Sequence, residues 1–151
     1  MRLVVQRVAR AEVRVGDELL GAIEAGAVVL VGIARGDFPE LVERMADKLA
    51  GLRYFADAAG LTNRPLEPGV ESFLVVSQFT LLADLRRGRR PGFADAEAPE
   101  VAASLVERFV TRLRDAGHRV ATGRFGASMQ LELVNDGPCT LLLDSARDLG
   151  S

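Results

Sequence analysis

The spacing of apolar residues changes several times along the chain, and each change predicts a different element. Apolar and polar residues alternate in 2–8 (RLVVQRV) and in 11–15 (AEVRV), a period of two that predicts two strands. A Gly-Asp turn then leads into 18–23 (ELLGAI), so the chain is expected to begin as an antiparallel meander. Residues 27–33 (AVVLVGI) are apolar on both faces, which is typical of a central strand.

Two later segments carry apolar residues at helical spacing. The first covers 37–52, where we expect Asp37 to be the N-cap and Pro39 to lie in the first turn. Its apolar stripe consists of Leu41, Met45, Leu49 and Leu52. The second helix is predicted from about residue 99 to 116, with a glycine directly after it. The residues expected to face the core are Val101, Leu105, Phe109 and Leu113.

The remaining segments predict further strands joined by turns. A short strand is expected at 53–56, a longer one at 71–79 (ESFLVVSQF), and two more at 128–134 and 139–144, separated by an Asn-Asp-Gly-Pro turn. The order of elements predicts one α/β domain over 1–151. Its core is a curved, mostly antiparallel and barrel-like β-sheet with two α-helices packed on one side.

Composition narrows the class of protein. The chain is 48% hydrophobic and 26% charged, with a formal charge of −2, which is typical of a globular domain and argues against broad phosphate-driven binding of nucleic acid. The single cysteine, Cys139, cannot form an internal disulfide. Arginines interrupt the N-terminal apolar residues, and the longest apolar run, Ala25 to Ala34, is too short for a bilayer. We therefore expect a cytoplasmic protein that does not bind membranes.

Two short stretches are the candidates for chemistry, and each also has a plain structural interpretation. Ser, Gln and Thr in 77–83 (SQFTLLA) commonly satisfy backbone groups at the end of a strand. The 135–140 segment (NDGPCT) has the composition of a hairpin turn. The only histidine, His118, follows a predicted helix end and is expected to be exposed or to contact the helix dipole. An arginine-rich loop at 86–90 either faces solvent or meets phosphates.

In this order and separation, SQFTLLA and NDGPCT resemble the two signature motifs of the D-aminoacyl-tRNA deacylases. The resemblance extends to VVQRVARAEVRV at 4–15, RRPGF at 89–93 and TGRFGASMQLELVNDGP at 122–138, and so covers essentially the whole chain. Members of this family hydrolyse the ester that joins a D-amino acid to tRNA. The resemblance therefore implies a proofreading hydrolase of translation whose partner is the aminoacylated 3′ end of tRNA, with no DNA partner.

The resemblance also implies an assembly and a set of site residues. Family members are homodimers with active sites at the subunit interface, where a cis Gly137-Pro138 peptide of one chain would enter the partner's site and exclude L-amino acids. Glycine would pass such a gate, so glycyl-tRNA is an expected second substrate. The match assigns the catalytic part of the pocket to Ser77, Gln78, Phe79 and Thr80, with the backbone N–H groups near Phe79 and Thr80 as donors to the ester carbonyl oxygen. It assigns Phe125 and Met129 to the part of the pocket that binds the substrate. We expect no cofactor and no metal, since one His and one Cys offer no ligand spacing.

Several alternatives remain open at this point. Thr80 is the obvious nucleophile, yet the only potential base beside it in sequence is Asp84. The preferred hypothesis is that the 2′-hydroxyl of the tRNA ribose helps to activate water while the protein positions the ester. Two other classes of function compete with the hydrolase: a module that binds the adenosine end without turnover, and a small oligomeric protein with a metabolite pocket at its subunit interface.

Overall fold

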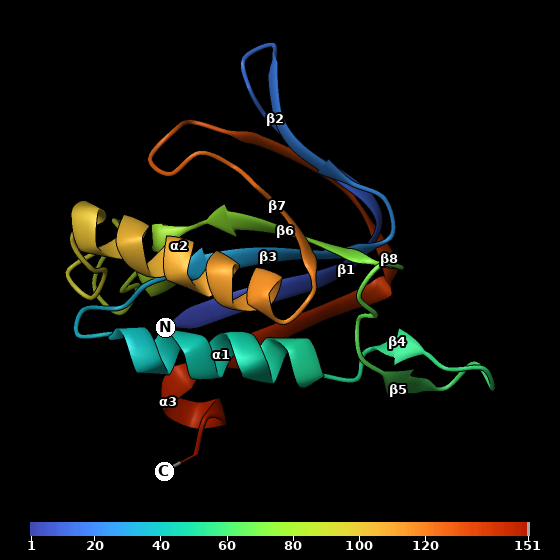
Figure 1. The fold of residues 1–151 in the computed structure, drawn as a ribbon. Coiled ribbons are helices and arrows are strands. Elements are labelled where there is room, and N and C mark those ends of the chain that lie inside the picture. The colour runs from blue at the N-terminus through green and yellow to red at the C-terminus, as the bar shows by residue number, and fades with distance from the viewer. Residues whose placement is uncertain (151) are drawn as a thin grey trace.

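The computed structural model describes residues 1–150, which form one large sheet, two long helices and a small two-stranded sheet (Figure 1). The strands of the large sheet are β1 (Arg2–Val15), β2 (Glu18–Ile23), β3 (Gly26–Gly32), β6 (Ser72–Ser77), β7 (Arg119–Thr122) and β8 (Gln130–Asp144). The helices are α1 (Pro39–Gly51), α2 (Pro99–Asp115), the short α3 (Ser145–Asp148) and the 3₁₀ helix η1 (Phe79–Leu82). The small sheet pairs β4 (Phe55–Ala56) with β5 (Thr62–Arg64).

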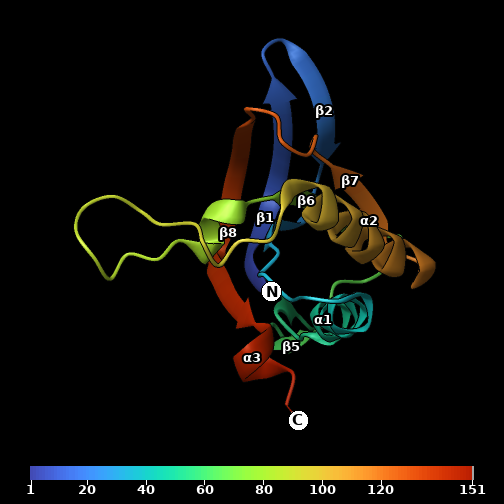
Figure 2. The same cartoon turned by 90° about the vertical axis from the view of Figure 1, so that its left-hand side faces the viewer.

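The predicted fold class is confirmed. The six-stranded sheet has the order β2-β1-β3-β6-β7, with β8 paired to β1, and α1 and α2 lie side by side against one face. The pairings of β1 with β2, β3 and β8 are antiparallel, whereas β3-β6 and β6-β7 are parallel. A view turned by 90° displays the strong curvature of the sheet, with β1, β2 and β8 rising away from the helices (Figure 2).

The first two predicted strands are one continuous strand, so that part of the prediction was wrong. In β1, Val5 packs on the helix side of the sheet, whereas Val8, Ala11 and Val13 belong to the core on the opposite, concave side. Val8 and Ala11 are three residues apart, so in a regular strand their side chains would face opposite sides of the sheet. An irregularity between Val8 and Arg10 resolves this conflict by shifting the phase of the pleat without ending the strand. The change of pattern in the sequence marks this shift.

The predicted hairpin turn at Asn-Asp-Gly-Pro was also wrong, because the strands on either side of it are one strand, β8. Asn135 pairs with Val8 of β1 and Thr140 pairs with Gln6, so 136–139 lie opposite Arg7 alone. The turn-forming residues thus make a wide bulge, and both halves of β8 run in the same direction along β1.

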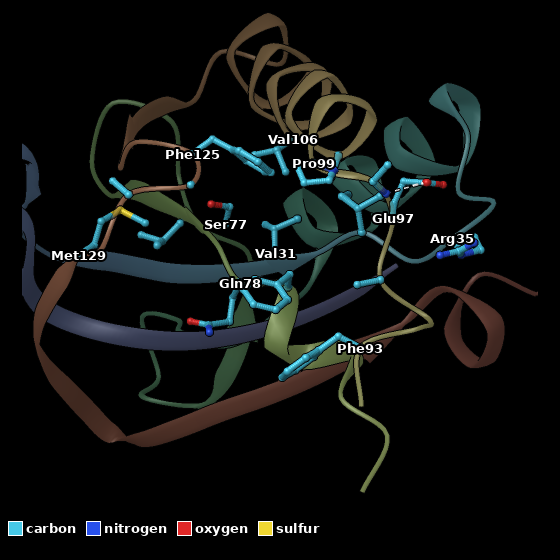
Figure 3. A pocket seen from close by; sticks show the side chains of 18 of the residues that line it. Val31, Arg35, Ser77, Gln78, Phe93, Glu97, Pro99, Val106, Phe125 and Met129 are labelled. Carbon is cyan, nitrogen blue, oxygen red and sulfur yellow. Dashed lines mark hydrogen bonds between the residues drawn. The ribbon is translucent and has the colours of Figure 1, made fainter. Parts of the chain in front are cut away.

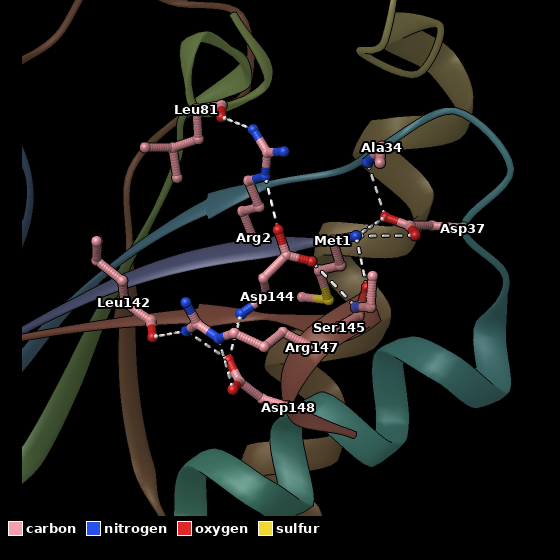
Figure 4. Close-up of polar contacts among 11 residues, drawn as sticks. Met1, Arg2, Ala34, Asp37, Leu81, Leu142, Asp144, Ser145, Arg147 and Asp148 are labelled. Carbon is pink, nitrogen blue, oxygen red and sulfur yellow. Dashed lines mark hydrogen bonds and ion pairs between the residues drawn. The ribbon is translucent and has the colours of Figure 1, made fainter. Parts of the chain in front are cut away.

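The two long helices occur where predicted, but their ends and faces differ in detail. Phe38, not Asp37, is the N-cap of α1, and it makes no side-chain capping bond. The Asp37 carboxylate instead accepts the backbone N–H of Ala34 at 2.7 Å and pairs with the Met1 amino group at 2.9 Å (Figure 4). In α2, Val101 is exposed rather than buried. The side chains of α2 that face the core are Ala102, Leu105, Phe109, Val110 and Leu113.

The apolar core has two parts, one on each face of the sheet. The larger fills the space between the helices and the sheet, with Met45 and Leu49 of α1 and Phe109 of α2 packed near Phe73 of β6. The smaller lines the concave face, where its edge is formed by partly buried residues that include Met129, Leu131 and Leu133. Salt bridges from Arg108 and Arg112 to acidic residues of α1 join the outer surfaces of the helices.

His118 is buried, so the prediction of an exposed residue or a dipole contact was wrong. Its ring packs edge-on against Phe73 at a centroid distance of 5.1 Å, and no hydrogen-bond partner for Nδ1 is found within residues 1–150. Burial lowers the pKa of the imidazole, because the charged form loses its hydration. This histidine is a core residue.

Other boundaries differ from the prediction because tertiary contacts set them. The strand predicted at 71–79 ends at Ser77 and turns into η1, and the strand predicted from 128 begins at Gln130. The strand expected at 53–56 is reduced to Phe55–Ala56, and β5, β7 and α3 had no predicted counterpart. Among residues 1–150, no helix has the length and apolarity needed to cross a membrane.

Candidate active site

A pocket of about 670 Å³ lies where β3 and β6 end and α2 begins (Figure 3). β3 and β6 are parallel, with Val31 paired to Ser77, so their carboxyl ends meet at the same edge of the sheet. Parallel strands of α/β folds commonly bind ligands at this edge. The loop between β7 and β8 closes the other side of the pocket through Phe125 and Met129.

Five of the predicted pocket residues line this cavity: Ser77, Gln78, Phe79, Phe125 and Met129. Thr80 does not line it. The Thr80 side chain is exposed on η1, directly beside the cavity, and its hydroxyl oxygen accepts a hydrogen bond from the side-chain amide of Gln78. The two predicted gate residues, Gly137 and Pro138, do not line the pocket of their own chain.

The start of η1 leaves two backbone donors free. The Leu81 N–H donates to the Gln78 carbonyl at 3.2 Å, which closes the turn. The N–H groups of Phe79 and Thr80 precede that bond, and no acceptor for either is found within residues 1–150. Unpaired N–H groups at the first turn of a helix carry partial positive charge. They are suited to binding an oxygen atom that gains negative charge.

Two contacts hold η1 in place against the sheet. A side chain at Gly32 would put its Cβ 3.0 Å from the Gln78 carbonyl oxygen and 2.5 Å from Leu82, so a glycine is needed for this close approach. Arg2 donates from Nη1 to the Leu81 carbonyl at 2.9 Å and from Nε to Asp144 at 2.9 Å (Figure 4). Arg2 thus links η1 to the end of β8.

The only carboxylate close to Thr80 in sequence is already paired. Asp84 accepts two charge-assisted hydrogen bonds from the Arg86 guanidinium, at 2.8 and 2.9 Å, and one from the Arg86 backbone N–H at 3.0 Å. These bonds lower the pKa of Asp84 to about 2, so its carboxylate is a very weak base. The described residues also contain no group of three or more His, Cys, Asp or Glu side chains placed to bind a metal ion.

The loop that carries Phe125 and Met129 is fixed by a sulfur contact. The backbone N–H of Arg124 lies 3.3 Å from Met129 Sδ. A Cβ at Gly123 would lie 2.5 Å from the same sulfur, so this glycine makes room for the methionine. On the opposite wall, the rings of Phe79 and Phe93 meet edge-to-face at 5.0 Å. The pocket therefore has apolar, shaped walls with a few polar groups at one side.

The Gly137-Pro138 peptide bond is cis, and both residues are exposed on the bulge of β8. Arg7 braces the bulge by donating from Nε to the Asp136 carbonyl at 3.1 Å and from Nη1 to the Tyr54 carbonyl at 2.6 Å. The Asn135 amide bridges the base of the bulge, since it donates to the carbonyls of Arg7 and Cys139 at 2.9 and 3.1 Å. The cis peptide is thus presented outward on a well-braced support.

Sequence reasoning missed several residues that the structure brings to the site. Phe93 lies within the RRPGF segment, which was noted only as part of a resemblance, while Arg35 and Glu97 line the far end of the pocket. The Glu97 carboxylate accepts the N–H groups of Gly36 and Ala98, and these bonds lower its pKa. No pattern in the sequence pairs these distant residues. Arg7 was likewise missed, because an arginine within a strand carries no signal of its bracing role.

Comparisons with known proteins identify the family. The family model described as D-Tyr-tRNA(Tyr) deacylase matches residues 4–144. A protein of Roseiflexus sp. (strain RS-1) named D-aminoacyl-tRNA deacylase is 57% identical over 146 residues, which cover 97% of this chain and 94% of the relative. A protein of the same name from Anaeromyxobacter dehalogenans (strain 2CP-C) is 56% identical over 97% of this chain and 99% of its own.

Solved structures have the same fold. The structure titled c-Myc DNA Unwinding Element Binding Protein is similar at a TM-score of 0.87 and 37% sequence identity, over 95% of this chain and 98% of that chain. A structure described as a probable eukaryotic D-amino acid tRNA deacylase shares the fold at a TM-score of 0.80 and 20% identity, over 94% and 97% of the two chains. The family model and the close relatives together establish that this chain belongs to the D-aminoacyl-tRNA deacylases, a family of hydrolases.

Proposed function

We propose that this protein hydrolyses the ester bond of D-aminoacyl-tRNA, releasing a free D-amino acid and tRNA, and so acts in the cytoplasm as a proofreading enzyme of translation. One observation carries the proposal: the N–H groups of Phe79 and Thr80 have no acceptor within residues 1–150, and they lie at and directly beside the wall of a pocket large enough for an aminoacylated nucleoside. Membership of the family supplies the substrate class.

The reaction needs a nucleophile and a stabiliser for the developing oxyanion. In the proposed mechanism, the ester carbonyl oxygen binds the N–H groups of Phe79 and Thr80. A water molecule attacks the carbonyl carbon, the bond from that carbon to the ribose oxygen breaks, and the ribose oxygen takes up a proton. The Gln78 and Thr80 side chains position the ester, and the neighbouring 2′-hydroxyl of the substrate helps to activate the water.

Within residues 1–150, the Thr80 hydroxyl has no hydrogen bond to a basic group that would activate it as a nucleophile. Its oxygen accepts a hydrogen bond from Gln78, which withdraws electron density, and Asp84 is held as a weak base by Arg86. A threonine hydroxyl attacks poorly unless a base removes its proton. These contacts favour the water mechanism over a covalent intermediate on Thr80.

Selection for the D-isomer is proposed to come from a second copy of the chain. In the homodimer that we propose, the exposed cis Gly137-Pro138 peptide of one subunit enters the pocket of its partner, where its carbonyls face the substrate Cα. This rigid backbone leaves no room for the side chain of an L-amino acid, so discrimination comes from steric exclusion. Glycine has no side chain to exclude, and glycyl-tRNA is therefore a proposed second substrate. The bracing of the bulge by Arg7 and Asn135 supports this role.

A binding function without turnover is the second candidate. The similar structure titled c-Myc DNA Unwinding Element Binding Protein is named for binding DNA, and it motivates a direct test here. A purely binding protein would retain the adenosine end of tRNA, or a DNA duplex, and would leave the ester intact. The formal charge of −2 does not favour binding to duplex DNA.

The test is deacylation of matched D-tyrosyl-tRNA and L-tyrosyl-tRNA by the purified protein, with a Gly137→Ala/Pro138→Ala double variant alongside. Hydrolysis of the D-ester only, with loss of activity or of chiral selection in the folded variant, would support the enzyme and its gate. Light scattering measures whether the protein is a dimer. If the folded wild-type dimer hydrolyses neither ester, the hydrolase proposal is rejected and the binding function takes first place.

A further inference from the structure

We propose that the loop of residues 85–91 (LRRGRRP) binds backbone phosphates of tRNA next to its aminoacylated end. This inference rests on the proposed function, because it assigns a surface to that same substrate. The loop contains four arginines in a chain whose formal charge is −2, so it concentrates positive charge at one place. It is exposed throughout and projects far from the body of the protein, as the long yellow-green loop in Figure 2.

Three of the four guanidinium groups are available to a ligand. Arg86 is used by the protein itself, since it pairs with Asp84 at the base of the loop at 2.8 Å. Arg87, Arg89 and Arg90 form no hydrogen bond or ion pair with any residue between 1 and 150. A guanidinium donates in a planar fork that matches the oxygens of a phosphate, and Arg is accordingly favoured in recognition of nucleic-acid backbones.

The base of the loop is anchored to the wall of the pocket. Asp84 and Gly92 exchange two backbone hydrogen bonds, at 2.7 and 2.9 Å, and so join the two ends of the loop. In the sequence, Phe79 precedes this pair and Phe93 follows it. Both residues line the pocket, and their rings contact each other. The free arginines are therefore carried on a support that begins and ends at the site where the ester is proposed to bind.

The chemistry of the proposed substrate identifies the partner. A pocket of about 670 Å³ accommodates one aminoacylated nucleoside, and the phosphates of the preceding nucleotides must then lie outside it. Those phosphates are the negatively charged groups of the substrate nearest the pocket, and the loop supplies the opposite charge beside it. Contacts of this kind fix the position of a nucleic acid without reading its sequence.

The experiment compares two substrates and two triple variants that change the charge equally. The loop variant is Arg87→Gln/Arg89→Gln/Arg90→Gln, and the matched control is Arg108→Gln/Arg112→Gln/Arg119→Gln on α2 and β7. Each is assayed for kcat/KM on D-tyrosyl-tRNA and on the D-tyrosyl ester of adenosine, which has no phosphate. Thermal unfolding and light scattering report the fold and the oligomeric state of every variant.

We expect the loop variant to lose about tenfold or more in kcat/KM on the tRNA ester at low salt and less than twofold on the adenosine ester. The slope of log kcat/KM against log salt should fall by about 2, because each single-strand phosphate contact contributes about 0.7. The control should resemble the wild type. Unchanged activity on tRNA, an equal loss on both esters, or dissociation of the dimer in the loop variant would each overturn the inference. If the wild type hydrolyses neither ester, the proposed function itself has failed.

Discussion

The side-chain amide of Gln78 donates a hydrogen bond to the hydroxyl oxygen of Thr80, so the two polar residues of the SQFT segment are partners on the rim of the pocket. This bond engages the oxygen that would have to attack the ester if Thr80 were the nucleophile. It leaves the hydroxyl proton free to be donated to the substrate. The pair is therefore suited to positioning an ester and poorly suited to attacking it.

Replacement of Thr80 by Ala should reduce activity without abolishing it. We expect kcat on D-tyrosyl-tRNA to fall by about tenfold, equivalent to about 1.4 kcal/mol, because only a positioning hydrogen bond is lost. Loss of a true nucleophile would lower kcat by a factor on the order of 10⁶. Single-turnover deacylation measures the difference, and Thr80→Ser, which keeps the hydroxyl, is the matched control. A folded Thr80→Ala protein with no activity, together with full wild-type activity on a substrate lacking the 2′-hydroxyl, would reject the water mechanism.

Gly32→Ala should impair catalysis by displacing η1. The added Cβ would meet the Gln78 carbonyl oxygen at 3.0 Å, and backbone cannot move aside as a flexible side chain can. We expect kcat/KM to fall by about 10- to 100-fold, with a loss of about 1–3 kcal/mol in the free energy of unfolding. Gly51→Ala at the end of α1 is the control, since nothing lies within 4 Å of its Cβ and a helical alanine is favoured. Equal activity of the two variants would show that η1 does not depend on this contact.

Arg7→Lys should weaken chiral selection more than it weakens binding. A single ammonium group cannot donate to both the Asp136 and the Tyr54 carbonyls in the geometry of the guanidinium, so the bulge that carries Gly137 becomes less fixed. We expect the ratio of kcat/KM for the D-ester to that for the L-ester to fall by about tenfold, or about 1.4 kcal/mol. Measured activities on both tyrosyl-tRNAs give this ratio.

Arg10→Lys is the control for that experiment, because Arg10 lies on the same strand and its ion pair with Glu132 is exposed. The ratio should be unchanged in this variant. An unchanged ratio in a well-folded Arg7→Lys protein would show that the hydrogen bonds of Arg7 to the bulge do not contribute to chiral selection.

Stability should fall as the pH falls below neutrality, because of His118. Burial lowers the pKa of its imidazole in the folded state, whereas the unfolded chain has a value of about 6.5. The unfolded state therefore binds more protons in this range. The corresponding stability is fully present above about pH 6.5 and is lost as the pH falls through the folded-state pKa. Over this range the free energy of unfolding falls by no more than about 1.4 kcal/mol per pH unit.

The measurement is urea unfolding between pH 7.5 and 5.5 for the wild type and for His118→Phe. Phenylalanine keeps the edge-on contact with Phe73 and removes the buried Nδ1 that has no partner among the described residues. The variant should lack this pH-dependent component and should be at least as stable as the wild type at pH 5.5. A wild-type slope that persists in the variant would assign the pH dependence to other groups.

The sequence was sufficient to predict most elements and the polar segment at the site. The helical stripe around Met45 and the continuous apolar run at 27–33 depend only on periodicity, and both appear in the structure. Five of the expected pocket residues come together because they follow strand ends or lie in a loop at the same edge of the sheet. Exposure was predicted less well, as His118 and Val101 demonstrate. An isolated residue contributes little to periodicity, and its burial depends on what packs against it.

By itself, the sequence determined the α/β class, the two long helices and the pair of motifs that resemble the deacylases. Only the tertiary structure decided that β1 and β8 are each continuous. The phase shift near Val8 and the bulge at Gly137-Pro138 exist because each strand must stay paired with a distant partner while its side chains change face. A turn-forming tetrapeptide is locally ambiguous between a hairpin and a bulge. Its pairing with Arg7 and its neighbours, more than a hundred residues away along the chain, decides which one forms.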